Sequence, residues 1–372
     1  MKIVFIIDSL RRHGTQRFLT HLARGLHELD YTREVIVLND ASDPEIEDSL
    51  TQSGCAITFI GKRSLLLAGV GWWRLVAKLR EIKADVVVTL LDFADTLGRP
   101  AARLAGARAI VTALRARNLA KPSWQRWIDR KTVAWADKVI LNSKEVVSYA
   151  REKEGVRENQ VVVIPNGVDD LRARSGALRD EYRQSLSLPP ATVLLGWVGR
   201  LVRQKNFPLL LRACAALSTK RDWKILVVGD GPEHERMQSL AHDVDLADRL
   251  IWLGSRGDVE AWLAAMDVFV HTADFEGMPN AVMEAMAMGL PVVVSDVDGN
   301  RELIRNGVDG YLVPCGDAVA FAKRIDEIID NPDLARRLGE QAHRDVLERF
   351  DLHRMIQSYH SLFVSLVRSK LA

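Results

Sequence analysis

Short apolar runs and longer amphipathic runs alternate along almost the whole chain. Apolar runs such as Lys2–Ile7 and Val193–Val198 have the length and composition of buried β-strands. The runs between them place their apolar side chains on one stripe, as in Thr15–Leu29, which is typical of amphipathic helices. Strands that alternate with helices in this way predict an α/β protein with parallel sheets covered by helices on both faces.

The alternation is interrupted near the middle of the chain. Pro165-Asn166-Gly167 is turn chemistry, and the charge-rich segment that follows it ends in a proline pair. A second alternating series then begins. We therefore expect two Rossmann-like domains facing across a cleft, because parallel sheets of this kind bind ligands at the carboxyl ends of their strands. The expected segments are an N-terminal domain over 1–168, a linker over 169–190, a C-terminal domain over 191–350 and a last helix over 351–372.

The composition fits this plan and excludes several classes of protein. The length of 372 residues suits two domains, and 48% apolar and 27% charged residues are ordinary for a globular protein. A net charge of +2 gives no signal for a nucleic-acid partner. Three widely spaced cysteines argue against a disulfide framework, and the first residues read as a strand rather than a signal peptide. No apolar run has the length of a membrane span, so we expect a cytoplasmic protein.

The most informative stretch is HTADFEGMPNAVMEAMAMG, residues His271–Gly289. It follows an expected strand at Asp267–Val270 and leads into a helix whose first position we expect at Pro279. Glu276 lies in the loop and Glu284 one turn into the helix. Free N–H groups at a helix start attract phosphate, whereas carboxylates accept hydrogen bonds from hydroxyls. A site that favours both an anion and a polyol predicts a sugar nucleotide as ligand.

Other candidate ligand-binding residues also follow expected strands. Arg200 and Lys205 could neutralise a diphosphate leaving group, although such cations alone are more typical of a solvated turn. Arg256 could stack on a base, with an exposed arginine as the alternative. Gly14, ahead of the first helix, allows close approach by a ligand. Further loop residues could line an acceptor site, though each is also typical of a solvated loop: Asp92, Arg115, Arg117 and Asn118.

Two segments, Lys62–Arg80 and Lys121–Lys138, combine tryptophans with basic residues. Basic amphipathic helices with aromatic side chains can lie at a lipid interface. The alternative is that the aromatic faces pack on the sheet and the cations point outward. We favour the packed arrangement for Lys121–Lys138 and leave both open for Lys62–Arg80.

Taken in order, the motifs of the chain resemble those of the family 4 glycosyltransferases. The spacing of Glu276 and Glu284 matches the E-x7-E motif of that family. The other matching segments are Gly199-Arg200-Leu201 with Lys205, Gly229-Asp230-Gly231-Pro232, Ile164-Pro165-Asn166-Gly167-Val168-Asp169 and Gly289-Leu290-Pro291-Val292-Val293.

The resemblance implies a GT-B fold in which the N-terminal domain binds the acceptor, the C-terminal domain binds the nucleotide sugar and the last helix crosses back onto the first domain. It also implies a metal-independent retaining transferase of the hexosyltransferase type, without a cofactor. The donor would be a UDP- or GDP-linked sugar and the acceptor a hydroxyl of a glycan or glycolipid, in the synthesis of cell-surface polysaccharide or lipopolysaccharide. Peripheral contact with the inner face of the cell membrane stays open, as do the donor sugar, the linkage and the oligomeric state.

The family also implies roles for the candidate residues. Arg200 and Lys205 would hold the diphosphate, Glu276 would contact the donor sugar, and Glu284 would bind the ribose hydroxyls. Arg256 would lie near the nucleotide, and Gly14 would approach the phosphate from the first domain. Backbone groups of one segment would contact phosphate and sugar hydroxyls: Gly277, Met278, Pro279, Asn280 and Ala281.

The chain departs from the family pattern in three places. His13-Gly14 stands where two glycines are frequent, Leu91–Asp95 lacks a histidine that many members carry, and Gly299-Asn300 replaces a glycine pair. The first two concern the first-domain contacts and the choice of donor sugar. Two other functions therefore remain as alternatives: an epimerase or phosphorylase of similar architecture, and a sugar-nucleotide-binding protein without turnover, which the missing histidine motivates.

Overall fold

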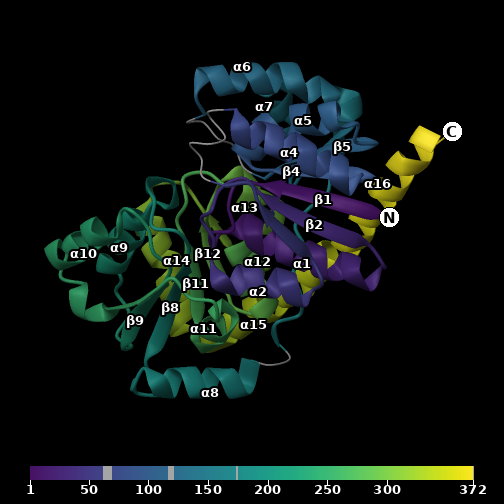
Figure 1. The fold of residues 1–372 in the computed structure, drawn as a ribbon. Helices are drawn as coiled ribbons and strands as arrows, with labels where there is room; N and C mark the ends of the chain where they lie inside the picture. The colour runs from purple at the N-terminus through teal and green to yellow at the C-terminus, as the bar shows by residue number, and fades with distance from the viewer. Residues whose placement is uncertain (62–68, 116–120, 173–174, 372) are drawn as a thin grey trace. The chain divides into compact units, whose positions relative to one another are not determined.

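The computed structural model describes residues 1–61, 69–115, 121–172 and 175–371. The chain forms two compact units (Figure 1). The N-terminal unit comprises Met1–Gly167 together with Leu352–Ala372, and the C-terminal unit comprises Val168–Asp351.

The N-terminal unit is built on a parallel sheet in the order β3-β2-β1-β4-β5-β6-β7. This is the doubly wound order, in which the chain starts in the middle and works outward in both directions. Its strands are β1 (Lys2–Ile7), β2 (Thr32–Val37), β3 (Ala56–Phe59), β4 (Val86–Leu90), β5 (Ala109–Leu114), β6 (Lys138–Leu141) and β7 (Val161–Val163).

Helices cover both faces of this sheet because alternate strand residues point to opposite sides. Phe5 belongs to the core under α1, α2 and α16, whereas Val4 and Ile6 belong to the core under α4 and α5. The helices are α1 (Gly14–Glu28), α2 (Pro44–Gln52), α4 (Val70–Ile82), α5 (Asp92–Ala105), α6 (Ser123–Thr132), α7 (Val146–Glu152) and α16 (Leu352–Leu371), with a 3₁₀ turn η1 (Val133–Trp135).

The last helix, α16, packs into the N-terminal unit against α1. The approach is close at Gly25, where an added Cβ would lie 2.1 Å from Cδ1 of Ile356. Tyr359 and Phe363 are fully buried in the same core. The N-terminal unit therefore depends on a helix that follows the entire C-terminal unit in sequence.

The C-terminal unit repeats the doubly wound plan with a six-stranded parallel sheet, β10-β9-β8-β11-β12-β13. Its strands are β8 (Val193–Val198), β9 (Trp223–Val228), β10 (Leu250–Gly254), β11 (Val268–His271), β12 (Val292–Ser295) and β13 (Tyr311–Val313). Its helices are α8 (Ser175–Ser185), α9 (Phe207–Ala215), α10 (His234–Asp243), α11 (Val259–Ala265), α12 (Asn280–Met288), α13 (Asp298–Leu303), α14 (Ala318–Asp330) and α15 (Pro332–Phe350).

Residues 169–190, which we expected to be a linker, contain helix α8. This helix packs against α11 within the C-terminal unit. Arg179 donates to Asp267 at 2.6 Å and Arg183 donates to it at 3.1 Å. The charged residues that suggested a linker therefore anchor α8 to Asp267, the residue that precedes β11. Helix α2 was not expected either, although Asp43 caps it by accepting from the backbone N–H of Glu45.

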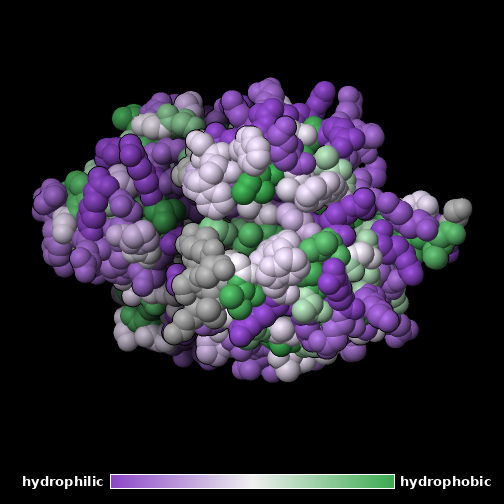
Figure 2. Space-filling model, turned by 45° about the horizontal axis from the view of Figure 1, so that its top comes forward, coloured by the Kyte–Doolittle hydropathy of each residue, from purple (hydrophilic) through white to green (hydrophobic). Residues whose placement is uncertain are grey.

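The packed interpretation of Lys121–Lys138 is wrong for its tryptophans. Trp124, Trp127 and Trp135 are exposed, at 51%, 64% and 44% of their surface. In Figure 2, which turns the top of Figure 1 toward the reader, weakly polar and hydrophobic side chains lie among hydrophilic ones on this face. In the other segment Trp73 is exposed, and its first residues, 62–68, lie outside the described residues.

Across the described helices, none combines the length and the apolar content needed to cross a bilayer. The three cysteines are free thiols, with Cys55 and Cys214 buried and Cys315 exposed.

Candidate functional site at the strand ends of the C-terminal unit

The site lies where the strand order of the C-terminal sheet reverses. Strands β8 and β11 are neighbours in that sheet, although β9 and β10 lie between them in sequence. The chain leaves the two strands toward opposite edges of the sheet, which opens a crevice at their carboxyl ends. The candidate residues Arg200 and Lys205 follow β8, and Glu276 follows β11.

The loop after β8 is held by backbone packing against the loop after β9. The N–H of Leu201 donates to the carbonyl of Asp230 at 3.0 Å. A Cβ added to Gly229 would lie 1.8 Å from the carbonyl oxygen of Gly199, and one added to Gly231 would lie 2.3 Å from that of Leu201. These two glycines therefore fix the shape of the loop that carries Arg200 and Lys205.

Backbone and side-chain hydrogen bonds join the loops after β8 and β11. The N–H of Asp274 donates to the carbonyl of Gln204 at 2.9 Å, and Nε2 of Gln204 donates to the carbonyl of Phe275 at 2.6 Å. Oγ1 of Thr272 donates to the carbonyl of Lys205 at 3.2 Å. The two loops therefore form one framework, although Lys205 and Glu276 are 71 positions apart in the sequence.

Within this framework Lys205 and Glu276 form an ion pair and a hydrogen bond between Nζ and Oε1. Burial alone would raise the pKa of Glu276, but the Lys205 ammonium and the neighbouring His271 outweigh it and lower that pKa to about 2. Burial lowers the pKa of His271, whose Nε2 lies 3.3 Å from Oε1 of Glu276. The carboxylate therefore stays ionised beside a cation and a neutral imidazole at physiological pH.

Arg200 is exposed at the start of the loop after β8, and its side chain forms no hydrogen bond or ion pair with any residue that the structure describes. The short turn η4 (Arg203–Lys205) separates it from α9. The site thus offers an exposed guanidinium for anion binding, while the Lys205 ammonium is already paired.

Helix α12 begins one residue later than expected. Pro279 is extended, with ψ of 110°, and serves as the N-cap residue, so Asn280 is the first helical position. A proline side chain cannot accept a capping hydrogen bond, so the helix end lacks a side-chain cap. Glu284 lies on the second turn of α12 and is 9% exposed. Gly277, Asn280 and Ala281 are half-buried and Met278 is buried at this end.

Gly299 supports the loop that carries Glu276. A Cβ at this position would lie 2.6 Å from the carbonyl oxygen of Gly277 and 2.9 Å from that of Glu276. Asn300 stands where the family often has the second glycine of a pair. It is fully buried and donates from Nδ2 to the carbonyl of Ser295 at 2.7 Å. Only the first glycine of the pair is therefore needed for this close contact.

Arg256 is held by Asp258 rather than projecting alone. Its Nε and Nη2 donate to Oδ1 and Oδ2 of Asp258, each at 2.9 Å, and this fork lowers the pKa of Asp258 to about 2. Gly14 belongs to the N-terminal unit, where it is exposed at the first position of α1.

The acceptor candidates of the N-terminal unit have different surroundings. Arg115 stacks on the ring of Phe18 at 3.5 Å and donates to Asn166, so it is not a solvated loop residue. Asp92 lies 3.2 Å from Nζ of the buried Lys121. Arg117 and Asn118 lie outside the described residues.

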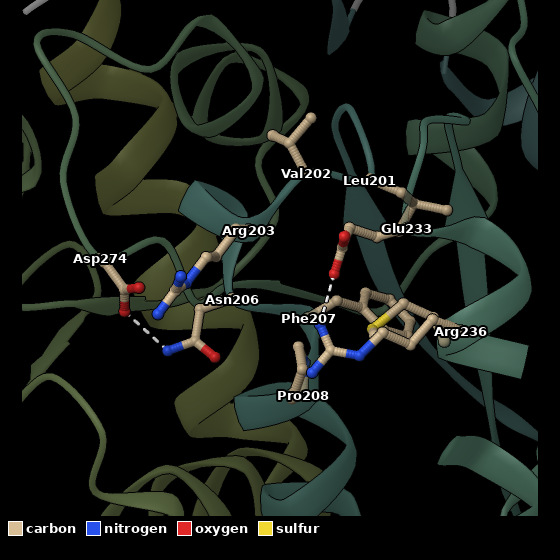
Figure 3. A pocket seen from close by; sticks show the side chains of 10 residues that line it. Leu201, Val202, Arg203, Asn206, Phe207, Pro208, Glu233, Arg236 and Asp274 are labelled. Atoms are coloured by element: carbon tan, nitrogen blue, oxygen red, sulfur yellow. Dashed lines mark hydrogen bonds and ion pairs between the residues drawn. The ribbon is translucent and has the colours of Figure 1, made fainter. Parts of the chain in front are cut away.

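The sequence did not predict a pocket of about 530 Å³ that is lined by the β8–α9 loop and by the first turns of α9 and α10 (Figure 3). Its polar rim is largely paired, since Arg236 donates to Glu233 at 2.6 Å and Asn206 donates to Asp274 at 2.7 Å. Arg200, Lys205, Glu276 and Glu284 do not line it. The pocket lies beside the candidate site, and its lining is Leu201, Val202, Arg203, Asn206, Phe207, Pro208, Glu233, Arg236, Met237 and Asp274.

Two doubly wound α/β units, one with cations and carboxylates at its switch point, have the architecture of the GT-B fold. Two family models match the chain: Glycosyltransferase Family 4 over residues 12–172 and Glycosyl transferases group 1 over residues 179–345. The chain belongs to glycosyltransferase family 4. Within the residues that the structure describes, no three histidine, cysteine, aspartate or glutamate side chains are grouped to hold a metal ion.

Relatives in sequence carry names from surface-glycan synthesis. An Escherichia coli UDP-Gal:alpha-D-GlcNAc-diphosphoundecaprenol alpha-1,3-galactosyltransferase is 29% identical over 78% of each chain. The Rhizobium meliloti lipopolysaccharide core biosynthesis glycosyltransferase LpsE is 32% identical, but the match spans about half of each chain, 49% of this one and 53% of LpsE.

Solved structures share the fold across nearly the whole chain. Anabaena HepE in complex with UDP and glucose has a TM-score of 0.86 at 24% identity, covering 98% of this chain and 100% of that one. Sucrose-phosphate synthase from Thermosynechococcus elongatus has a TM-score of 0.82 at 20% identity, covering 99% of both.

Proposed function

We propose that this transferase moves a hexose from a UDP-linked donor, with retention of configuration, to a hydroxyl of a lipid-linked glycan on the inner face of the cell membrane. The observation that carries the proposal is the Lys205–Glu276 pair at the adjoining ends of β8 and β11. It puts a cation for the leaving diphosphate directly beside a carboxylate for the sugar hydroxyls.

In the proposed reaction the bond between the anomeric carbon and the β-phosphate oxygen breaks, and a bond to the acceptor oxygen forms. Arg200 and Lys205 stabilise the negative charge that develops on the UDP leaving group. The acceptor proton passes to the departing phosphate, as the family resemblance implies. These two cations supply the neutralisation that a metal ion would otherwise provide, so we propose metal-independent transfer without a cofactor.

The remaining roles follow from position in the C-terminal unit. Glu284, almost buried on α12, would accept hydrogen bonds from the ribose hydroxyls. Backbone N–H groups near the start of α12 would bind phosphate because the helix end lacks a side-chain cap. Arg256, oriented by Asp258, would present the face of its guanidinium to the base.

The choice of UDP and of a lipid-linked acceptor has separate support. The E. coli relative, which this chain matches over 78% of both lengths, is named for a UDP-linked donor and a diphosphoundecaprenol-linked acceptor. Relatives named for malate or 2-deoxystreptamine acceptors match over about half of this chain, 50% and 51%. The longer match favours the lipid-linked class.

The test is to incubate the full chain with UDP- and GDP-linked hexoses, with and without a polyprenyl-diphosphate-linked acceptor. We expect nucleotide release from a UDP-sugar that depends on the acceptor, and a product whose anomeric configuration by NMR equals that of the donor. Release from a GDP-sugar alone would overturn the choice of donor, and an inverted product would overturn retention.

Two further outcomes would support the other functions considered. Isomerised sugar nucleotide in the absence of acceptor would indicate an epimerase. A thermal shift with UDP, without transfer to any member of an acceptor panel, would indicate a binding protein, since a ligand that binds only the folded state raises its stability.

A further inference from the structure

Helix α6 of the N-terminal unit has its polar residues inside and its aromatic residues outside. Gln125, Asp129 and Thr132 are at most 6% exposed, whereas Trp124 and Trp127 are 51% and 64% exposed. A surface helix of a globular protein normally shows the opposite arrangement, with an apolar stripe toward the core.

The exposed residues form one continuous stripe. Trp124, Trp127, Lys131 and Trp135 follow each other in steps of three, four and four residues, which keeps them on one side of α6 and η1. Lys131 and Arg130 are exposed on this segment, and its single acidic residue, Asp129, is 1% exposed. We call Trp124, Trp127, Lys131 and Trp135 the aromatic stripe. Its surroundings on α6 are therefore cationic, without an exposed carboxylate.

A buried polar network holds α6 in this orientation. Oδ1 of Asp129 accepts from Thr96 at 2.8 Å and from Arg99 at 2.7 Å, and its Oδ2 lies 2.9 Å from Nζ of Lys121. Gln125 donates to Oγ1 of Thr96 at 3.1 Å. Turning the helix to bury its tryptophans would remove Asp129 from these partners and leave buried charges unpaired, which is costly. The buried contacts of Asp129 therefore keep the aromatic stripe exposed.

The neighbouring helices continue the same chemistry. Helix α5 packs against both α4 and α6, so all three cover one side of the sheet (Figure 1). On α4, Val70 and Trp73 are 51% and 59% exposed, and on α5 Leu104 is 44% exposed. Exposed cations on these two helices include Arg74, Arg80 and Arg103, and α4 also exposes one carboxylate, Glu81.

We propose that the aromatic stripe is a docking surface for a bilayer that contains anionic phospholipid. Tryptophan rings partition to the level of the lipid headgroups, and lysine and arginine are attracted to anionic lipid. A stripe that combines both and exposes no carboxylate on its helix matches this partner. The inference deepens the proposed function, because it names the surface by which the transferase meets its lipid-linked acceptor.

The binding test is flotation of the full chain with vesicles of phosphatidylcholine alone or mixed with phosphatidylglycerol. We expect the unchanged chain to float with the mixed vesicles, and salt to reduce the fraction that floats. That fraction should fall about tenfold or more in the double variants Trp124→Ala/Trp127→Ala and Arg130→Glu/Lys131→Glu. Matched controls lie in the C-terminal unit: Val319→Ala, at an apolar residue 72% exposed, and Arg212→Glu/Lys220→Glu, at two exposed cations. These controls should float as the unchanged chain does.

Several results would overturn the proposal. These are no flotation of the unchanged chain, equal flotation with both kinds of vesicle, or equal loss in the stripe variants and their controls. A stripe-dependent dimer in sedimentation, without vesicle binding, would show that a second copy occupies the surface instead.

A transfer assay separates this inference from the proposed function. With a water-soluble acceptor analogue, the stripe variants should keep the unchanged rate, because the stripe touches no proposed donor-binding residue. With the acceptor embedded in mixed vesicles, they should be about tenfold slower at low protein concentration. If the unchanged chain and all variants failed to transfer sugar while the unchanged chain still floated with mixed vesicles, the proposed reaction would be contradicted. The proposal of a docking surface would then still hold. Equal rates of the stripe variants and controls on vesicles would count against the docking surface alone.

Discussion

Nε2 of His271 lies 3.3 Å from Oε1 of Glu276, and the same carboxylate is paired with Lys205. His271 is fully buried at the end of β11, so its protonation is governed by burial together with this small group of charges. Burial and the Lys205 cation lower the pKa of His271, and Glu276 opposes them only in part. The imidazole is therefore neutral in the folded protein under conditions where a solvated histidine would begin to charge.

This arrangement predicts that acid destabilises the protein through His271. An unfolded histidine takes up a proton as the pH falls through about 6.5, whereas the folded protein resists it because the pKa of His271 is lowered. The unfolded state then binds more protons, so stability falls with falling pH. We expect His271→Gln to lose less stability than the unchanged chain between about pH 7.5 and about pH 5.5, measured by urea unfolding midpoints.

The control is His353→Gln, at an exposed position of α16. It should keep the pH dependence of the unchanged chain. Glu276 contributes separately, because its pKa of about 2 lies below the ordinary 4.5, so its stabilisation is lost only as the pH falls below about 4.5. An equal pH dependence in His271→Gln and His353→Gln would contradict the prediction.

Removing the Lys205 ammonium should impair catalysis. Lys205→Ala would withdraw the cation that we assign to the leaving diphosphate and leave Glu276 without its ion-pair partner. We expect a loss of about 3 kcal/mol in transition-state stabilisation, or roughly a hundredfold in kcat/KM, measured as nucleotide release with saturating acceptor. Arg200→Ala should lose a similar amount.

Arg203→Ala provides the comparison for the Lys205 variant. Arg203 lies two residues earlier in the same 3₁₀ turn, is exposed, and lines the neighbouring pocket instead of pairing with Glu276. It should keep kcat/KM within about threefold of the unchanged enzyme. Comparable losses in both variants would mean that the turn, rather than the ammonium, matters.

The two glutamates should affect different kinetic constants. Glu284→Gln replaces one hydrogen-bond acceptor for the ribose, so KM for the donor should rise by about tenfold with a smaller change in kcat. Glu276→Gln removes the negative charge beside Lys205 and should lower kcat more than it raises KM. Glu235→Gln, an exposed position on α10, should change neither. The reverse split between the first two variants would exchange the roles assigned to them.

Gly299 should not tolerate a side chain. In Gly299→Ala the new Cβ would meet two backbone oxygens of the Glu276 loop, at 2.6 Å and 2.9 Å, which cannot turn away as a side chain could. We expect a loss of about 1–3 kcal/mol in unfolding free energy, with reduced turnover because the loop shifts. Gly176→Ala, where nothing lies within 4 Å of the new Cβ, should be neutral or slightly stabilising. Unchanged turnover in Gly299→Ala would show that the loop adapts.

Much of the fold was predictable because short-range patterns decide it. Strand β1 runs over the predicted residues Lys2–Ile7, since a buried parallel strand needs only a continuous apolar run. Helix α8 was missed because its anchoring depends on Asp267, far away in sequence. Helix α6 was located, but its orientation was not, because the partners that bury Asp129 lie on α5.

The candidate site shows the same division. Its residues could be placed at strand ends from sequence, and the sheet order brings β8 and β11 together. The pairing of Lys205 with Glu276 could not be predicted, because it depends on the hydrogen bonds that join the two loops. The likeness of Gly299-Asn300 to a glycine pair was visible in the sequence, whereas the contact of Gly299 with the Glu276 loop depends on how α13 packs against that loop.

The position of α16 has a consequence for biosynthesis. Phe18 and Leu22 of α1 share a core with Tyr359 and Phe363 of α16. In a nascent chain this face of α1 is therefore not yet covered by α16 while residues 168–351 emerge from the ribosome. The second unit can be complete before the first one is closed. Vectorial translation thus delays the final folding of the first-made half until the last helix is released.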